Sequence, residues 1–117
     1  MERRFNTPIE RLAYGIDFHE IEEVKKAIAD GADVNANHPD HYNYQPLMLQ
    51  AVIELNAEAF ELMAQNGGNV CACNDAGNLT YDVAEEIIDE MQKILETIKK
   101  YEKPFEDESE AQNASNS

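Results

Sequence analysis

The sequence predicts an all-α fold that repeats a pair of short antiparallel helices. Two stretches carry this prediction, residues 29–36 and residues 65–72, because each ends an amphipathic helical run at a glycine and continues into Val-Asn or Val-Cys. A glycine just past the last apolar residue of a helix can adopt a positive φ, which caps the helix and redirects the chain. Recurrence of the whole pattern indicates a repeat protein.

Composition favours one folded domain without a membrane span. Hydrophobic residues make up 43% of the 117 residues, and no apolar run reaches the ~18 residues of a membrane helix. The formal net charge of −15, from 24 acidic and 9 basic residues, opposes direct binding to nucleic acid or to an anionic membrane. It favours a basic partner instead, although the charge could serve only solubility.

The cysteines and the N-terminus predict a cytoplasmic protein. Cys71 and Cys73 stand two positions apart, so a bridge between them would close a badly strained loop. A reducing compartment is the natural interpretation. Residues 1–5 lack the apolar stretch of a secretory signal.

The first helix is predicted to begin at Thr7, which can cap it, with Pro8 in the first turn and Glu10 completing a capping box. Gly15 near its end indicates a short helix of about two turns, which needs a neighbouring helix to be stable. Apolar residues at helical spacing give it one buried face: Ile9, Leu12, Ala13 and Ile16.

Three further helices are predicted before residue 70. The first spans about residues 19–30, and a loop follows over residues 37–46. Residues 47–54 form a helix that is apolar all round, which indicates a helix placed between neighbours or one facing a partner. A turn at residues 55–56 leads into its partner helix, residues 57–63.

The final helical region starts at Thr80 and is either unbroken or interrupted near Asp89. Its apolar stripe comprises Tyr81, Ala84, Ile87, Ile88, Met91, Ile94, Leu95 and Ile98. Residues 102–117 are acidic and polar, and are predicted to form a disordered tail after a domain of residues 1–101.

Residues 31–36 read G-A-D-V-N-A, which is the ankyrin-repeat signature. Residues 75–84 resemble the family's D-x-x-G-x-T-P-L-x-x-A segment, and residues 45–51 resemble T-P-L-H-x-A-A. The resemblance implies an ankyrin-repeat solenoid of paired antiparallel short helices with extended finger loops. It divides the domain into three repeats, residues 7–36, 37–72 and 73–101, of which the outer two are atypical.

The spacing departs from the family period of about 33 residues, since Gly31 and Gly67 stand 36 positions apart. We place most of the residues by which this spacing exceeds the family period in the finger of residues 37–45. This finger carries Tyr42 and Tyr44, and tyrosines recur at interface hot spots. Its neighbouring polar residues, also predicted to contact a partner, are His38, Asp40 and His41.

By the resemblance, ankyrin proteins bind partners through finger tips and a concave face of inner helices. The concave and finger residues to which this applies here are Tyr14, Tyr42, Tyr44, Leu49, Val52 and Val83. A zinc site of His38, His41, Cys71 and Cys73 is the sharpest chemical alternative, but Cys-x-Cys and His-x-x-His are weak spacings. We therefore predict no metal, no cofactor and no catalytic residue.

The sequence thus predicts a protein-binding module or small protein inhibitor, monomeric on its own, whose partner is another protein with a basic surface. The alternative is an acidic nucleic-acid mimic that blocks the DNA- or RNA-binding site of an enzyme. A mimic needs carboxylates arrayed on one face, whereas a binding module needs an exposed apolar surface.

Overall fold

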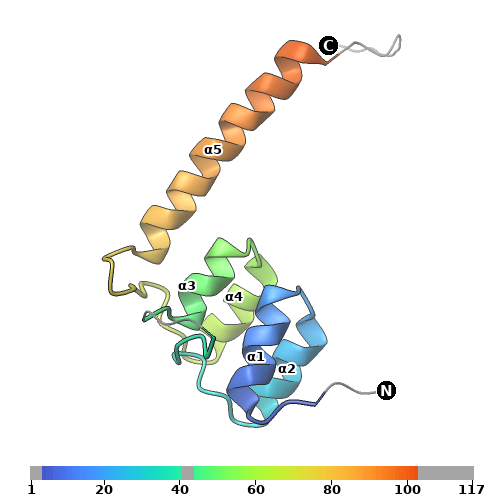
Figure 1. The fold of residues 1–117 in the computed structure, drawn as a ribbon, viewed down its shortest axis with the longest axis vertical. Helices are drawn as coiled ribbons and strands as arrows, with labels where there is room; N and C mark the ends of the chain where they lie inside the picture. The colour runs from blue at the N-terminus through green and yellow to red at the C-terminus, as the bar shows by residue number, and fades with distance from the viewer. Residues whose placement is uncertain (1–3, 41–43, 103–117) are drawn as a thin grey trace. The chain divides into compact units, whose positions relative to one another are not determined.

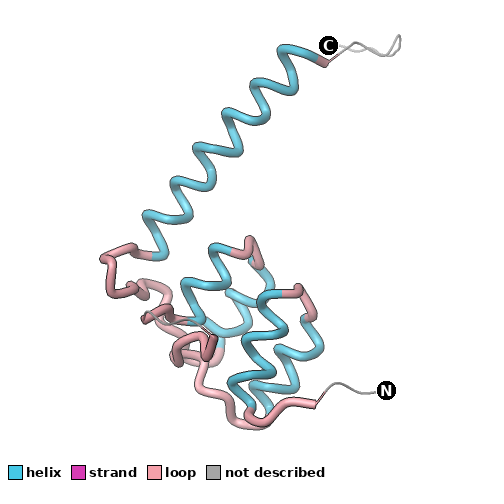
Figure 2. Tube along the Cα trace, in the orientation of Figure 1, coloured by secondary structure: helices cyan, strands magenta, loops and turns pink. Residues whose placement is uncertain are grey.

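The computed structural model describes residues 4–40 and 44–102 (Figure 1). This part of the chain holds helices and loops but no strand, which confirms the all-α prediction (Figure 2). The helices are α1 (Pro8–Asp17), α2 (Ile21–Ala29), α3 (Leu47–Ile53), α4 (Ala57–Gln65) and α5 (Thr80–Tyr101). None of these helices is both long and apolar enough to cross a membrane.

The chain divides into two compact units, Met1–Glu86 and Ile87–Ser117. The first unit contains α1 to α4 and the first turns of α5, and the described part of the second is the rest of α5 with Glu102. The predicted tail lies outside the described residues, except for Glu102.

Helix α1 begins as its sequence predicts. The Thr7 hydroxyl accepts a hydrogen bond from the Glu10 backbone N–H (3.1 Å), and Pro8 occupies the first turn. The Glu10 carboxylate reaches back to the backbone N–H of Asn6 (2.8 Å), one residue before the cap. Two N-terminal donors are thereby satisfied by side chains.

Gly15 was predicted to lie near the end of a short helix, and α1 ends two residues later, at Asp17. Gly15 also allows α2 to approach α1 closely. A Cβ atom at this position would lie 2.7 Å from Cγ2 of Val24 and 2.9 Å from its backbone nitrogen. The glycine is needed for helix packing here rather than for a turn.

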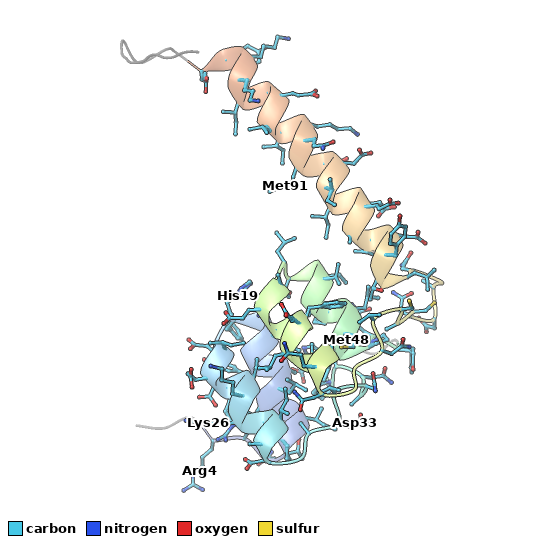
Figure 3. The ribbon with its side chains drawn as sticks, turned by 180° about the vertical axis from the view of Figure 1, so that it is seen from behind. Arg4, His19, Lys26, Asp33, Met48 and Met91 are labelled. Atoms are coloured by element: carbon cyan, nitrogen blue, oxygen red, sulfur yellow. The ribbon has the colours of Figure 1, made fainter. Side chains whose placement is uncertain are left out.

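The α1–α2 hairpin and the α3–α4 hairpin repeat one another in detail at an offset of 36 residues. His19 (labelled in Figure 3) and Leu55 occupy the two turns between helices, with φ of +57° and +58°. Gly31 and Gly67 follow the second helices, with φ of +94° and +92°. The matching values show that the two hairpins have the same backbone path, and they confirm both glycines as left-handed residues.

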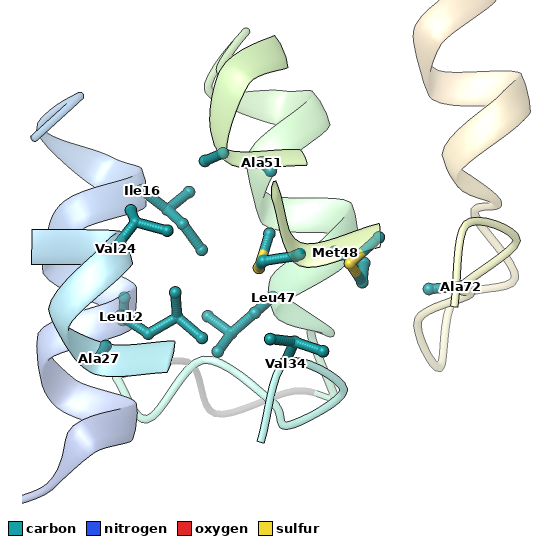
Figure 4. Close-up of a cluster of buried hydrophobic side chains, with 12 residues drawn as sticks. Leu12, Ile16, Val24, Ala27, Val34, Leu47, Met48, Ala51 and Ala72 are labelled. Carbon is teal, nitrogen blue, oxygen red and sulfur yellow. The ribbon is translucent and has the colours of Figure 1, made fainter. Parts of the chain in front are cut away.

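The core lies where the two hairpins pack, α1 against α3 and α2 against α4. In Figure 4, Leu12 and Ile16 of α1 and Val24 of α2 lie across from Leu47 and Met48 of α3. All five side chains are fully buried. Burying each stabilises the fold by about 1.5–3 kcal/mol relative to leaving it exposed.

Asn56 connects the two hairpins. Its side-chain oxygen caps α4 by accepting from the Ala59 backbone N–H (3.1 Å), and its amide nitrogen donates to the Ile16 carbonyl near the end of α1 (3.1 Å). The residue is buried, with 6% of its surface exposed. One side chain therefore satisfies backbone groups on two helices, which a buried amide must do to offset its desolvation.

Asn35 connects the loops that follow the two hairpins. Its amide nitrogen donates to the Gly67 carbonyl (3.0 Å), and its side-chain oxygen accepts from the Asn69 backbone N–H (2.7 Å). Asp33 and Asn69, 36 positions apart, each accept a backbone N–H from two residues ahead. The loops thus repeat as the helices do.

The finger after each loop closes in the same way, but the first is longer. The Leu47 N–H donates to the Ala36 carbonyl (2.9 Å), and the Thr80 N–H donates to the Ala72 carbonyl (3.0 Å). These closures enclose residues 37–46 in the first finger and 73–79 in the second. The extra length therefore lies in the first finger, where the sequence places it.

Two alternatives were open for the last helical region, and the structure has the unbroken one. Helix α5 runs continuously from Thr80 to Tyr101 without a turn at Asp89. Its side chains, Met91 among them, stand out along the helix in Figure 3. No second helix folds back within residues 73–102, so the third predicted repeat lacks its hairpin.

Gly31→Val should lower the free energy of unfolding by more than about 1 kcal/mol, because a β-branched residue resists φ near +94°. No atom lies within 4 Å of the added Cβ, so crowding does not contribute. Gly31→Asn is the control and should cost less, because asparagine tolerates left-handed geometry. Chemical denaturation that finds Gly31→Val as stable as the parent would contradict the left-handed cap.

Asn56→Ala should lower the free energy of unfolding by about 2–4 kcal/mol. The loss of the cap contributes about 1 kcal/mol, and the unpaired Ile16 carbonyl contributes about 1–3 kcal/mol. Asn66→Ala is the matched control, because the Asn66 side chain is exposed and donates only to the Leu62 carbonyl of its own hairpin. Equal effects of both substitutions on denaturation would show that Asn56 does not connect the hairpins.

Candidate functional site

The base of the first finger is held by a buried polar network. The Asp40 backbone N–H donates to Nδ1 of His38 (3.0 Å), so His38 carries its proton on Nε2. Nε2 in turn lies 2.7 Å from Oδ2 of Asp17, at the end of α1. His38 is only 4% exposed, so this histidine joins the finger to the first hairpin.

Two glutamines extend the network towards the second finger. The Gln50 amide nitrogen on α3 donates to the Asp17 carboxylate (3.0 Å) and to Glu54 (3.1 Å). Its side-chain oxygen accepts from the Gln45 amide (3.1 Å), and Asn74 of the second finger lies within reach of the Gln45 oxygen (3.4 Å). A network with satisfied members rigidifies its surroundings, so the ends of this finger have a fixed position.

The structure corrects the sequence analysis at two predicted contact residues. Leu49 is fully buried, because the apolar α3 lies between neighbouring elements, and it offers a partner no surface. His38 is buried too, because its ring closes the network beneath the finger. Both side chains support the surface from inside.

The other predicted contact residues have varied positions. Tyr14 is half-buried between the rings of Phe5 and Phe18, at centroid distances of 5.3 and 4.8 Å. Asp40 is exposed, and so is 51% of Tyr44. Val52 and Val83 are half-buried on α3 and α5. His41 and Tyr42 lie outside the described residues.

The residues of the alternative zinc site do not form a cluster in the described part of the chain. No group of three or more His, Cys, Asp or Glu side chains is placed there to hold a metal ion. His38 is instead hydrogen-bonded to Asp17, and Cys71 and Cys73 are both free thiols. Cys71 is exposed, whereas Cys73 is partly buried.

The first unit has an apolar groove of about 680 Å³. We call it the α3–α4–α5 groove, because its walls are the end of α3, the start of α4 and the first turns of α5. Its floor is closed by the second loop, where the Thr80 hydroxyl donates to the Val70 carbonyl. The lining residues are Ala51, Val52, Leu55, Asn56, Ala57, Phe60, Glu61, Val70, Cys71, Thr80, Tyr81 and Ala84.

Helix α5 continues through the position at which the second hairpin turns. The finger closures place Thr80 at the position of Leu47, an offset of 33, and the turn residue Leu55 then corresponds to Ile88. Leu55 adopts φ of +58°, which a β-branched residue such as Ile88 resists. This difference favours a continuous helix α5 over a third hairpin.

The groove is apolar with an acidic edge. Leu55 is 57% exposed and Val70 is 50% exposed, which is unusual for neighbouring large apolar side chains. Glu61 is the one charged residue among the described residues that line it. On the α5 wall, a hydrogen bond from Tyr81 to Glu85 and the negative charge of Glu85 raise the pKa of the Tyr81 hydroxyl.

Sequence reasoning found little of this groove. Of the predicted contact residues that the structure describes, Val52 is the one that lines it. The informative signal was Ile88, because an isoleucine at the turn position predicts that the third hairpin stays open.

Comparison with models of known protein families finds no match to this chain, and comparison with curated proteins finds no significant similarity. The likeness of the sequence to ankyrin repeats therefore comes from the letters of residues 31–36, 45–51 and 75–84.

His38→Ala should lower the free energy of unfolding by about 2 kcal/mol or more, because hydrogen bonds to charged groups contribute about 1.5–3 kcal/mol each. Asp40→Ala is the matched control, since the backbone N–H that binds His38 remains. Thermal melts in which both variants match the parent would show that His38 does not hold the finger.

Proposed function

We propose that this chain is a non-catalytic protein-binding module or inhibitor of ankyrin-like architecture. It acts by docking an apolar, basic-flanked helical segment of another protein in the α3–α4–α5 groove. The observation that carries the proposal is the groove itself, an apolar surface at which Leu55, Val70 and Tyr81 are each at least half exposed.

The ankyrin-like architecture has support from the repeated geometry. Two hairpins share left-handed residues at equivalent turns, His19 with Leu55 and Gly31 with Gly67, and two fingers close through equivalent hydrogen bonds. Extended fingers that follow antiparallel helix pairs are what the G-A-D-V-N-A letters imply. In such an arrangement the next helix of the stack would cover α3 and α4, so the groove is a vacant packing position.

The shape of the vacant position favours a helix as its occupant. The walls are helical on both sides, and the exposed apolar side chains Leu55, Val70 and Tyr81 surround the opening. An amphipathic helix lays its apolar face into such a groove with anchors at positions i, i+3 or i+4, and i+7.

Charge favours a partner with basic flanks. The lining contributes the carboxylate of Glu61, the neighbouring helical residues Glu58 and Glu85 are acidic, and the chain carries a net charge of −15. Such a field accelerates association with a basic segment and disfavours an acidic one. Apolar contact would supply most of the affinity, and charge would supply selectivity.

The first finger is a second candidate surface, because Tyr44 is exposed above a rigid polar network. Truncating a buried interface tyrosine often costs 2 kcal/mol or more in binding. Tyr44 and Tyr81 are both largely exposed tyrosines in the first unit, one on the finger and one on the groove wall. Comparing them discriminates between the two surfaces.

The binding test uses a labelled synthetic helix of about 15 residues with a leucine face and lysine flanks as the probe. Tyr81→Ala and Val70→Glu should each weaken its binding by about tenfold or more, since they remove apolar wall or add charge. Tyr44→Ala should leave the affinity unchanged. Fluorescence anisotropy gives the dissociation constants, and thermal melts confirm that each variant stays folded.

The controls separate three outcomes. A matched helix with glutamate flanks should bind at least tenfold more weakly. If Tyr44→Ala weakens binding and Tyr81→Ala does not, the finger is the interface and the groove proposal fails. If no tyrosine matters but Glu→Gln changes and salt abolish binding, the nucleic-acid mimic is favoured instead.

A further inference from the structure

Helix α5 carries a stripe of large apolar side chains along one side. Within the second unit, five apolar side chains of this stripe are each about half exposed, at 48–56%. They are Ile88, Met91, Ile94, Leu95 and Ile98. A helix that exposes large aliphatic residues over three turns favours association with another apolar surface.

The spacing of the stripe is that of a paired helix. Ile87, Met91, Ile94 and Ile98 alternate by four and three residues, which keeps one seam facing a partner along the helix. Ile88 and Leu95 widen the seam on one side. A second helix can therefore follow α5 for at least three turns.

The charges of α5 are divided between its two halves. Residues 80–90 contain five carboxylates, Asp82, Glu85, Glu86, Asp89 and Glu90, and no basic residue. Residues 91–101 contain Lys93, Lys99 and Lys100 with the single carboxylate Glu96. Two copies of a helix with an acidic first half and a basic second half have complementary charges only when they pair antiparallel.

The chain's own third hairpin fits the stripe poorly. At the offset of 33, the buried residues Ala59 and Met63 of α4 correspond to Gln92 and Glu96. A helix folded back in that register would bury two polar side chains and leave the apolar stripe outside. The occupant that matches the stripe is thus an equally apolar helix with the opposite charge order.

We propose that α5 pairs antiparallel with α5 of a second copy of this chain. Ile87 of one copy packs against Ile98 of the other, and Met91 packs against Ile94, which gives four apolar layers. In this register Lys99 and Lys100 of one copy lie level with Glu86 and Glu85 of the other. The inference replaces the expectation of a monomer and does not depend on the groove of the first unit.

Sedimentation equilibrium of the full chain tests the pairing at about 150 mM salt, where repulsion between two acidic copies is screened beyond about 8 Å. The parent should sediment as a dimer. Ile94→Glu should be a monomer, because it places a charge in two apolar layers. Gln92→Glu, which makes the same charge change outside the stripe, should remain a dimer.

Two results would overturn the proposal. One is a parent chain that stays monomeric up to about 1 mM, because the dissociation constant of any dimer would then exceed that concentration. The other is an Ile94→Glu variant that dimerises like the parent. The melting transition of the first unit, followed by circular dichroism, should be the same in all three proteins, so misfolding cannot imitate the result.

Orientation is tested by disulfide formation in a Cys71→Ser, Cys73→Ser background. A mixture of the Ile87→Cys and Ile98→Cys proteins should form cross-linked heterodimers under mild oxidation. Neither protein alone should cross-link, because equivalent positions lie eleven residues apart along the antiparallel pair, about 16 Å. Efficient cross-linking of the Ile87→Cys protein with itself would indicate parallel helices and contradict the proposal.

Discussion

Each hairpin of the first unit depends on one residue in a left-handed backbone conformation between its helices. His19 and Leu55 both adopt it, although neither is glycine. Such a conformation costs about 1–2 kcal/mol for an ordinary residue, and the packing of the hairpin core offsets this cost. At the third equivalent position stands Ile88, whose branched Cβ resists the conformation. The branched side chain of Ile88 thus favours a continuous helix from Thr80 to Tyr101 over a third hairpin.

The first unit combines two kinds of cohesion. Leu12, Ile16 and Leu47 hold the hairpins together by apolar burial, which tolerates small shifts between helices. Asp17, His38 and Gln50 are joined by hydrogen bonds of 2.7 and 3.0 Å, which do not tolerate them. The finger beside this network is consequently placed by directional bonds, and Tyr44 extends from a rigid base.

Local signals predicted much of the fold. Thr7 and Pro8 marked the start of α1, Gly31 and Gly67 marked the ends of the hairpins, and the extra length of the first finger was assigned correctly. Such signals act within a few residues, so one sequence is enough to find them. The ankyrin solenoid, in contrast, was inferred from the resemblance of short sequence segments to a known family, and it stays a prediction.

Sequence reasoning missed features that depend on contacts between residues far apart in the chain. Gly15 is predicted to lie near a helix end, but the sequence does not reveal that the approach of Val24, nine residues later in the chain, requires a glycine there. His38 is predicted to contact a partner, yet Asp17 and the Asp40 backbone bind it from two sides. The groove was missed for the same reason, since residues distant in the sequence line it and no motif marks it.

The bridge made by Asn35 bears on how such a chain could grow by duplication. Asn35 joins its own loop to the next one through both ends of its amide, and the equivalent residue of the next loop is Cys71. A thiol is a weak donor and a weak acceptor, so it cannot replace the amide in joining a further loop. An internal copy of residues 37–72 would therefore add a loop that lacks the side-chain hydrogen bonds by which Asn35 joins the first two loops. Lengthening this protein by such a duplication would need asparagine at position 71, whereas the copied Leu55 would already supply the turn between the added helices.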